Sequence, residues 1–224
     1  MENIGCSSIP FRSSKVAEHA PCIVYLHGFN SSPASIKGQQ LGRAIAVLPI
    51  ATRPTYFLPQ LHHRPQQAVR DVSQWVDTRR PKRLTFVGSS LGGFYATHLA
   101  ETYGAKAVLI NPALHPDRDL APYLGAQRNP YTGEAYELTA EHFAELSAFK
   151  VARIARPQHY LLLVQTGDAV LDYRVAVAFY AGAWQFVRGG GDHAFHDFAA
   201  QLPVILRFAG VDPAAVERQR TGAA

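Results

Sequence analysis

The chain has 224 residues, of which 47% are hydrophobic and 17% are charged, a balance that fits one globular domain and excludes an intrinsically disordered chain. The formal net charge of +5 comes from scattered Lys and Arg, and no nucleic-acid-binding motif accompanies the densest basic run, residues 79–83. We interpret that run as a solvated loop and expect no nucleic-acid partner.

The N-terminal stretch and the two cysteines indicate the cellular context. Residues 1–20 mix charge and polarity without the apolar stretch of a signal peptide, and no segment reaches the length of a membrane span. Cys6 lies in this polar stretch and Cys22 in an apolar run, so no disulfide framework is predicted. We therefore expect a cytoplasmic protein in which Cys22 is a buried, unreactive core residue. The pattern predicts no particular oligomeric state.

Short apolar runs alternate with segments of helix length along the chain. Runs rich in Val, Ile, Leu and aromatics predict parallel strands buried on both faces, and the segments between them predict crossover helices. The predicted fold class is therefore α/β, with a mostly parallel sheet of about six strands and helices on both faces. The expected strands are residues 22–26, 46–50, 84–87, 107–110, 160–165 and 184–187, and the expected helices are residues 37–46, 66–78, 94–103 and 173–181.

One connection is longer than a simple crossover requires. Residues 112–156 contain several prolines and the turn-like sequence Asn129-Pro130-Tyr131-Thr132-Gly133, which predicts a small lid inserted into a single domain, 1–224. A last helix is expected over residues 195–209, where Gly210 ends it, followed by a polar tail at 212–224.

The strongest chemical signal is Gly88-Ser89-Ser90-Leu91-Gly92, a G-x-S-x-G pattern between an expected strand and an expected helix. A sharp strand-to-helix turn strains the backbone at the serine, and glycines on both sides prevent clashes while the hydroxyl projects above the sheet. The alternative is a structural glycine-rich turn of the Rossmann kind, but no G-x-G-x-x-G sequence is present. Ser90 is the predicted nucleophile.

Partners for such a serine follow in the chain order acid, then histidine, each after a later strand. Asp168 follows the run at 160–165, and His193 follows the run at 184–187. A histidine must take the serine proton, and a carboxylate on its other nitrogen must fix the tautomer. We predict that His193 and Asp168 fill these roles, and we interpret Asp172 as a helix cap and Asp192 as a turn residue.

Stabilisation of the oxyanion requires two backbone N–H donors, commonly the residue after the nucleophile and one in the first loop. These are Leu91 and Phe29 in this sequence. We interpret His27, in the same loop, as a packed rather than a catalytic histidine. The spacing of His193 and His196 could serve a shared metal, but no H-E-x-x-H pattern or cysteine cluster supports one, so we expect neither metal nor cofactor.

Six segments of the sequence carry a family resemblance: Tyr25-Leu26-His27-Gly28-Phe29-Asn30-Ser31-Ser32, Val87-Gly88-Ser89-Ser90-Leu91-Gly92-Gly93-Phe94-Tyr95-Ala96, Asn111-Pro112-Ala113, Asn129-Pro130-Tyr131-Thr132-Gly133-Glu134, Gln165-Thr166-Gly167-Asp168 and Gly191-Asp192-His193-Ala194-Phe195. Together they resemble the YqiA/YcfP-type small bacterial esterases of the α/β-hydrolase superfamily, and the resemblance covers Cys22 to Gly210. It implies a compact α/β hydrolase that acts on acyl esters or acyl-CoA thioesters, with its nucleophile, acid and base on Ser90, Asp168 and His193.

The predicted function is that of a serine esterase that hydrolyses small-molecule acyl esters through an acyl-enzyme on Ser90. Two alternatives stay open: an acyl-CoA thioesterase with the same three residues, and a non-catalytic binding protein of the same fold. We expect Tyr123, Tyr131 and Phe143 to line the acyl site. An anionic thioester would be favoured if cations surround the mouth of the site rather than merely solvate the surface; the candidates are Arg118, Arg128, Lys150, Arg174 and Arg188.

Overall fold

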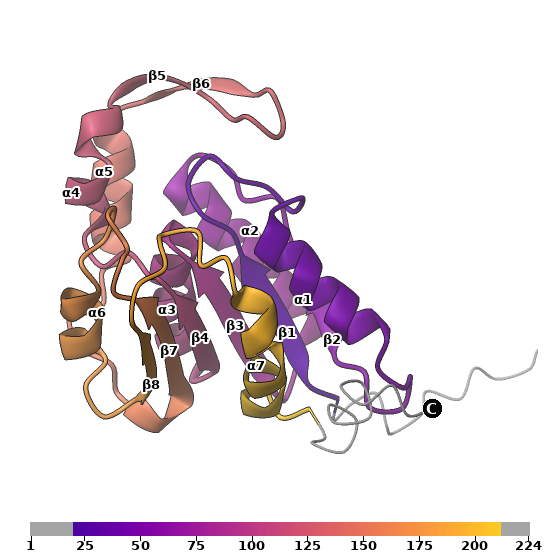
Figure 1. Cartoon of the computed structure of the whole chain (residues 1–224). Coiled ribbons are helices and arrows are strands. Elements are labelled where there is room, and N and C mark those ends of the chain that lie inside the picture. The colour runs from indigo at the N-terminus through magenta and orange to yellow at the C-terminus, as the bar shows by residue number, and fades with distance from the viewer. Residues whose placement is uncertain (1–19, 212–224) are drawn as a thin grey trace, which may run out of the picture.

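Six parallel strands form the central sheet of the computed structural model, which describes residues 20–211 (Figure 1). Their order across the sheet is β2-β1-β3-β4-β7-β8, so the central strand β3 carries Ser90 directly after it. This arrangement confirms the predicted α/β class. The strands are β1 (Cys22–Leu26), β2 (Thr55–Phe57), β3 (Leu84–Ser89), β4 (Lys106–Ile110), β7 (Tyr160–Gln165) and β8 (Trp184–Arg188).

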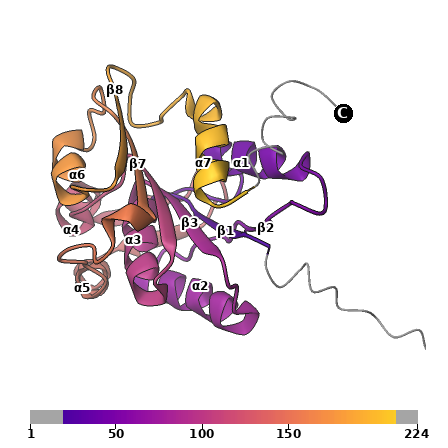
Figure 2. The same cartoon turned by 90° about the horizontal axis from the view of Figure 1, so that it is seen from below.

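Helices cover both faces of the sheet (Figure 2). Because successive strand residues point to opposite faces, Ile23 packs in the core cluster with α1 and α7, and Val24 packs in the cluster with α2, α3 and α6. Burial on both faces explains why these strands read as continuous apolar runs. The helices are α1 (Ile36–Ala46), α2 (Pro65–Arg79), α3 (Leu91–Tyr103), α6 (Tyr173–Phe179) and α7 (Leu202–Phe208).

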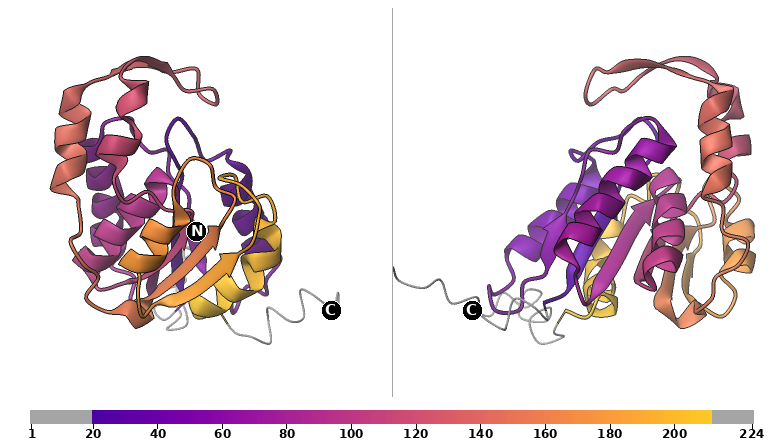
Figure 3. Two further views of the ribbon diagram at one scale, coloured as in Figure 1. Left: turned by 60° about the vertical axis from the view of Figure 1, so that its left-hand side comes forward. Right: turned by 180° about the vertical axis from the view of Figure 1, so that it is seen from behind.

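The segment between β4 and β7 leaves the sheet and returns to the neighbouring strand. It contains an antiparallel hairpin that extends over the carboxyl ends of the strands (Figure 3). In the chain, the hairpin stands between two helices, and these helices lie at one side of the sheet. Strands β4 and β7 nevertheless pair directly, with Ala107 opposite Tyr160. The elements of this segment are α4 (Pro116–Asp119), η1 (Ala121–Tyr123), β5 (Gly125–Arg128), β6 (Ala135–Leu138), α5 (Ala140–Ala148) and η2 (Pro157–His159).

The prediction of a strand at residues 46–50 is wrong. Helix α1 continues to Ala46, and the residues after it form turns in which Ile50 is 86% exposed. Pro49 also removes a backbone donor from the middle of that apolar run, which disfavours a strand inside a sheet. The edge strand is instead the short β2, whose first residue, Thr55, donates its amide to the carbonyl of Pro21.

The last helix begins later than predicted. Phe195 has a φ of 55°, which an α-helix does not accommodate, and a 3₁₀ turn, η3 (Phe198–Gln201), precedes α7. Gly210, with a φ of 83°, follows the helix as expected. The predictions for Cys6, for the rest of residues 1–19 and for the tail at 212–224 lie outside the described residues. Between residues 20 and 211, no helix combines the length and the apolar character that crossing a membrane requires.

Candidate active site

Ser90 lies in a turn between β3 and α3 that only small neighbours allow. Its backbone has a φ of 57° and a ψ of −123°, outside the ordinary range for a non-glycine residue. A Cβ added at Gly88 would lie 2.2 Å from the carbonyl oxygen of Gly92, and one added at Gly92 would lie 2.0 Å from that of Leu26. The glycines therefore allow the close backbone contacts that hold the Ser90 side chain above the carboxyl end of the sheet.

The side chains of Ser90, His193 and Asp168 form a hydrogen-bonded chain in the order that the sequence predicts. His193 Nδ1 lies 2.8 Å from Asp168 Oδ2, and His193 Nε2 lies 3.0 Å from Ser90 Oγ. Since an ionised carboxylate only accepts, the Nδ1 hydrogen faces Asp168 and leaves Nε2 to accept the Ser90 hydroxyl. The arrangement can therefore move a proton from the hydroxyl to the imidazole.

Asp168 is enclosed, with a side chain that is 1% exposed. Burial acts to raise the pKa of this carboxyl, but hydrogen bonds from His193 and from the amides of Leu171 and Val170 outweigh it and lower the pKa. The two amides donate to Oδ1 at 2.9 and 2.8 Å, which leaves Oδ2 for His193. Asp168 is thus held ionised and oriented at the same time.

Asn111, at the end of β4, anchors the loop that carries His193, a role that the sequence reasoning missed. Its buried side chain donates from Nδ2 to the carbonyls of Asp192 and His193, at 3.0 and 3.2 Å. Its Oδ1 accepts the amide of Gln165 at 3.1 Å. One side chain therefore links the strand that precedes Asp168 to the histidine loop.

Two further side chains hold the same loop. Gln165 accepts the amide of Asp192 at 2.9 Å and donates to Asp197 at 2.6 Å. Lys37, from α1, donates its ammonium to the carbonyl of Ala194 at 2.7 Å. The only sequence signal for these roles is that the polar residue Gln165 ends the buried apolar strand β7.

The loop after β1 lies against Ser90. A Cβ added at Gly28 would lie 3.3 Å from Ser90 Cβ. Within residues 20–211, the amides of Phe29 and Leu91 donate to no other protein group, so both are free to bind a ligand oxygen. His27 is packed as predicted: it accepts the amide of Leu61 at Nε2, at 3.1 Å, and burial lowers its pKa.

A cavity of about 370 Å³ opens beside the Ser90 hydroxyl and the His193 ring. Its volume is within the usual range for small-molecule sites. Apolar side chains dominate its walls, and the rings of Phe29 and Tyr123 lie 5.8 Å apart on one side. The main lining residues are Phe29, Leu91, Pro116, Leu120, Tyr123, Val170 and Leu171.

Comparison with known proteins identifies the family. A profile described as "Uncharacterised protein family (UPF0227)" matches residues 22–210. The chain belongs to this UPF0227 family. This confirms the resemblance to the YqiA/YcfP-type proteins. A UPF0227 protein of Shewanella baltica (strain OS185) is 25% identical over 191 residues, which cover 83% of this chain and 98% of the relative.

Solved structures with the same fold include mouse alpha/beta hydrolase domain-containing protein 10, at a TM-score of 0.65 and 15% identity, covering 83% of this chain and 88% of that one. The esterase domain of a Rhodothermus marinus protein aligns at a TM-score of 0.61 and 16% identity, covering 94% of this chain and 90% of that one. At these identities the likeness defines the fold. The UPF0227 chain therefore has the α/β-hydrolase fold.

The other acidic residues near the site have the places that the sequence predicts for them. Asp172 caps α6, where its side chain accepts the amide of Arg174 at 3.0 Å. Asp192 accepts the amide of Phe195 at 3.1 Å and so shapes the turn after His193. Neither carboxylate takes the position of Asp168 beside the imidazole.

Two of the three side chains expected at the acyl site lie elsewhere. Tyr123 lines the cavity, but Tyr131 is 51% exposed at the turn of the hairpin, and Phe143 packs against the main core cluster.

Cys22 is buried as predicted, and burial raises the pKa of its thiol to about 11. The thiol is therefore a core group without nucleophilic character.

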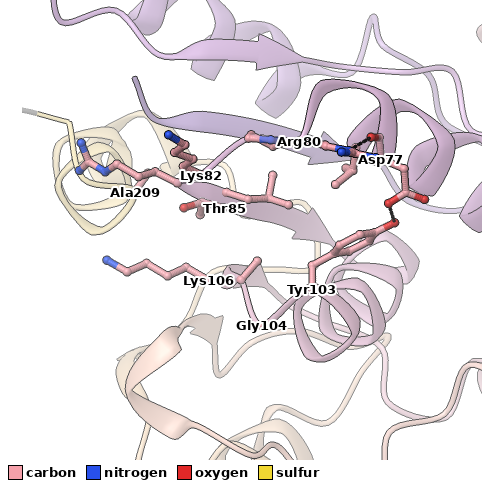
Figure 4. A pocket seen from close by; sticks show the side chains of 13 residues that line it. Asp77, Arg80, Lys82, Thr85, Tyr103, Gly104, Lys106 and Ala209 are labelled. Carbon is pink, nitrogen blue, oxygen red and sulfur yellow. Dashed lines mark hydrogen bonds between the residues drawn. The ribbon is translucent and has the colours of Figure 1, made fainter. Parts of the chain in front are cut away.

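A larger cavity, of about 590 Å³, lies at the opposite end of the sheet, beside the amino-terminal residues of β3 and β4 (Figure 4). Residues 80–83 of the basic run border it, and Tyr103 donates to Asp77 Oδ1 at 3.0 Å on one wall. Lys106 also lines it, but its ammonium donates to the carbonyl of Phe208 at 2.9 Å. The larger of these two cavities therefore lies away from Ser90.

Proposed function

We propose that this protein is a serine hydrolase of carboxylic esters that works through an acyl-enzyme on Ser90. The hydrogen-bonded chain from Ser90 Oγ through His193 to the ionised Asp168 carries the proposal. The apolar cavity beside the hydroxyl provides room for an acyl group. The strained backbone at Ser90 also fits a functional rather than a structural turn.

In the proposed first half-reaction, Ser90 Oγ attacks the ester carbonyl carbon while His193 Nε2 takes the hydroxyl proton. The amides of Phe29 and Leu91 stabilise the negative carbonyl oxygen of the tetrahedral intermediate. The bond to the alcohol then breaks, and His193 returns the proton to the departing alkoxide. In the second half, His193 takes a proton from water, the hydroxide attacks the acyl carbon, and Ser90 regains its proton.

The charges around the site favour a neutral ester over an acyl-CoA thioester. The carboxylate of Asp119 lines the cavity, and its pairing with Arg118 leaves no net positive charge on these two residues to attract an anion. Three of the five cations expected at the mouth form ion pairs: Arg118 with Asp119 at 3.3 Å, Arg174 with Asp172 at 2.8 Å, and Arg188 with Asp197. Pairing reduces the field that these residues could exert on an incoming anion.

Labelling with a fluorophosphonate probe tests the proposed chemistry. We expect stoichiometric labelling of the wild-type protein and none of Ser90→Ala. Ser90→Ala and His193→Ala should each lower kcat for a short-chain ester by roughly 10⁴ to 10⁶, and the double variant should lose little more, because the residues act as a unit. A folded wild-type protein that neither labels nor hydrolyses esters would be a binding protein instead.

The choice between ester and thioester is tested by salt. If the paired charges exert little field, kcat/KM for an acyl-CoA thioester and for a neutral ester should fall equally between low and moderate ionic strength. Both substrates are measured on one preparation, which controls for any effect of salt on the fold. A clearly steeper fall for the thioester would favour the thioesterase alternative.

A further inference from the structure

The β5–β6 hairpin is hydrogen-bonded to the residue that follows Phe29. Asn30 has a φ of 49°, and its side-chain amide is held at both ends by the hairpin. Its Nδ2 donates to Gln127 Oε1 at 3.0 Å, and its Oδ1 accepts the hydroxyl of Tyr136 at 2.8 Å. Gln127 and Tyr136 lie directly opposite each other on the two strands, so one cross-strand pair of the hairpin binds one side chain of the loop.

The turn of the hairpin holds the next residue of the loop. Asn129, which is 6% exposed, donates from Nδ2 to the carbonyl of Ser31 at 2.9 Å. Its Oδ1 accepts the amides of Tyr131 and Thr132, at 2.9 and 3.2 Å, which fixes the asparagine within its own turn. The hairpin therefore contacts two consecutive residues of the loop through three hydrogen bonds.

The side chains of Gln127 and Tyr136 are themselves held by further contacts. Gln127 Nε2 donates to the carbonyl of Tyr123 at 2.6 Å. The ring of Tyr136 stacks on the ring of His63, with centroids 4.4 Å apart and an interplanar angle of 19°. His63 in turn hydrogen-bonds to the buried His142 of α5 at 3.2 Å. The hairpin thus presents to Asn30 two polar groups that other contacts already hold in place.

The direction of the Phe29 amide depends on its two neighbours, since that amide has no protein partner within residues 20–211. On one side, Gly28 lies against Ser90. On the other side, Asn30 is held by the hairpin. We propose that Gln127 and Tyr136 are positioning residues which, through Asn30, aim the Phe29 amide at the oxyanion. This inference rests on the esterase function proposed above.

Asn30 and Gln127 also line the cavity, so direct contact with substrate is the rival explanation. Both polar atoms of the Asn30 amide bind the hairpin, and Gln127 uses its oxygen for Asn30 and its nitrogen for Tyr123. Each amide nitrogen keeps a second N–H that a substrate could accept, but the hairpin bonds already set the direction of both side chains. The two explanations predict different kinetics: loss of a substrate contact raises KM, whereas loss of an aimed oxyanion donor lowers kcat.

The test compares Tyr136→Phe with Tyr131→Phe, which removes a hydroxyl from the exposed turn of the same hairpin. Each is assayed with an ester and with the matching thionoester, whose sulfur accepts weaker hydrogen bonds than oxygen and gains less from an oxyanion hole. Removing a whole oxyanion donor costs about 10² to 10³ in kcat, so misaiming one by Tyr136→Phe should cost about 10-fold on the ester. The thionoester should lose much less, and KM for both should stay nearly constant.

Gln127→Ala provides a second variant that acts on the other end of the same amide, and it should shift the ester-to-thionoester ratio in the same direction. A raised KM with unchanged kcat would instead make these residues substrate contacts. An unchanged ratio in labelled, folded Tyr136→Phe would overturn the positioning role alone, whereas a wild type that does not label would overturn the esterase function first.

Discussion

The two halves of the candidate active site are held in place by different kinds of structure. The turn around Ser90 is fixed by backbone packing between β3, α3 and β1, which leaves no room for a Cβ at Gly88 or Gly92. The loops of Asp168 and His193 are fixed by hydrogen bonds from side chains and loop amides. Added atoms should therefore disrupt the turn at Ser90, and loss of polar groups should disrupt the loops of Asp168 and His193.

Removing the orienting charge from the hydrogen-bonded half should have the largest effect. We expect Asp168→Asn to lower kcat by about 10⁴, the size of the loss when the imidazole is left in the wrong tautomer. The matched control is Asp172→Asn, which alters a carboxylate four residues later and should leave kcat nearly unchanged. Steady-state kinetics on a short-chain ester measure both, and a reversed order would reassign the acid.

Adding one atom to the packed half should mainly affect stability. A methyl group at Gly92 would meet the carbonyl of Leu26 at 2.0 Å, and neither backbone can move away without disturbing the sheet. We expect Gly92→Ala to lower the free energy of unfolding by about 3 kcal/mol. Gly189→Ala is the control, because a Cβ there has nothing within 4 Å, and it should stay within about 0.5 kcal/mol.

Denaturant unfolding of both glycine variants gives the comparison. Equal midpoints for Gly92→Ala and the wild type would show that the turn at Ser90 relaxes easily. The contrast between the two halves of the site would then be lost.

Loss of the Asn111 side chain should misplace His193 without unfolding the protein. Asn111 has a φ of 40°, so Asn111→Gly keeps a tolerated backbone and removes three hydrogen bonds. A shift of about 1 Å in a catalytic group can cost 10²-fold, and we expect a fall in kcat of about that size with KM little changed. His196→Ala, at an exposed position of the same loop, should keep wild-type kcat.

The smallest expected effect is on acid stability. Because hydrogen bonds lower the pKa of Asp168 in the folded protein, its carboxylate stabilises the fold above the unfolded pKa of about 3.9. That contribution is lost as the pH falls through the lower folded-state pKa. The free energy of unfolding of Asp168→Asn should therefore depend less on pH below about 4 than that of the wild type. Parallel curves from denaturant titrations in this range would contradict the prediction.

The same contrast explains what the sequence could predict. Elements buried on both faces repeat a local pattern, so β7 agrees with the prediction at both ends and β1 does too. The prediction of a strand at 46–50 was wrong because this apolar run follows a helix and part of it is exposed. Strand β2 was not predicted because three residues at the edge of a sheet are too few to show a hydrophobic pattern.

In the candidate site, the turn at Ser90 and the chain order of Ser90, Asp168 and His193 are local signals that the sequence contains. The anchoring contacts of Asn111 and Asn30 are different in kind. Asn30 meets Gln127 at a separation of 97 residues, and Asn111 meets His193 at 82. Which polar side chains meet at such distances depends on how the β5–β6 hairpin and the loops pack, and no local pattern encodes it.

The direct pairing of β4 with β7 has a consequence for how such a protein can evolve. The sheet is continuous without the 49 residues between Ile110 and Tyr160, because the two flanking strands are hydrogen-bonded neighbours. Insertions, deletions or a replacement of that segment would alter one wall of the cavity beside Ser90 while the registers of the six strands persist. The three hydrogen bonds to Asn30 and Ser31 set the condition for such an exchange: a replacement segment must supply equivalent donors and acceptors at that point.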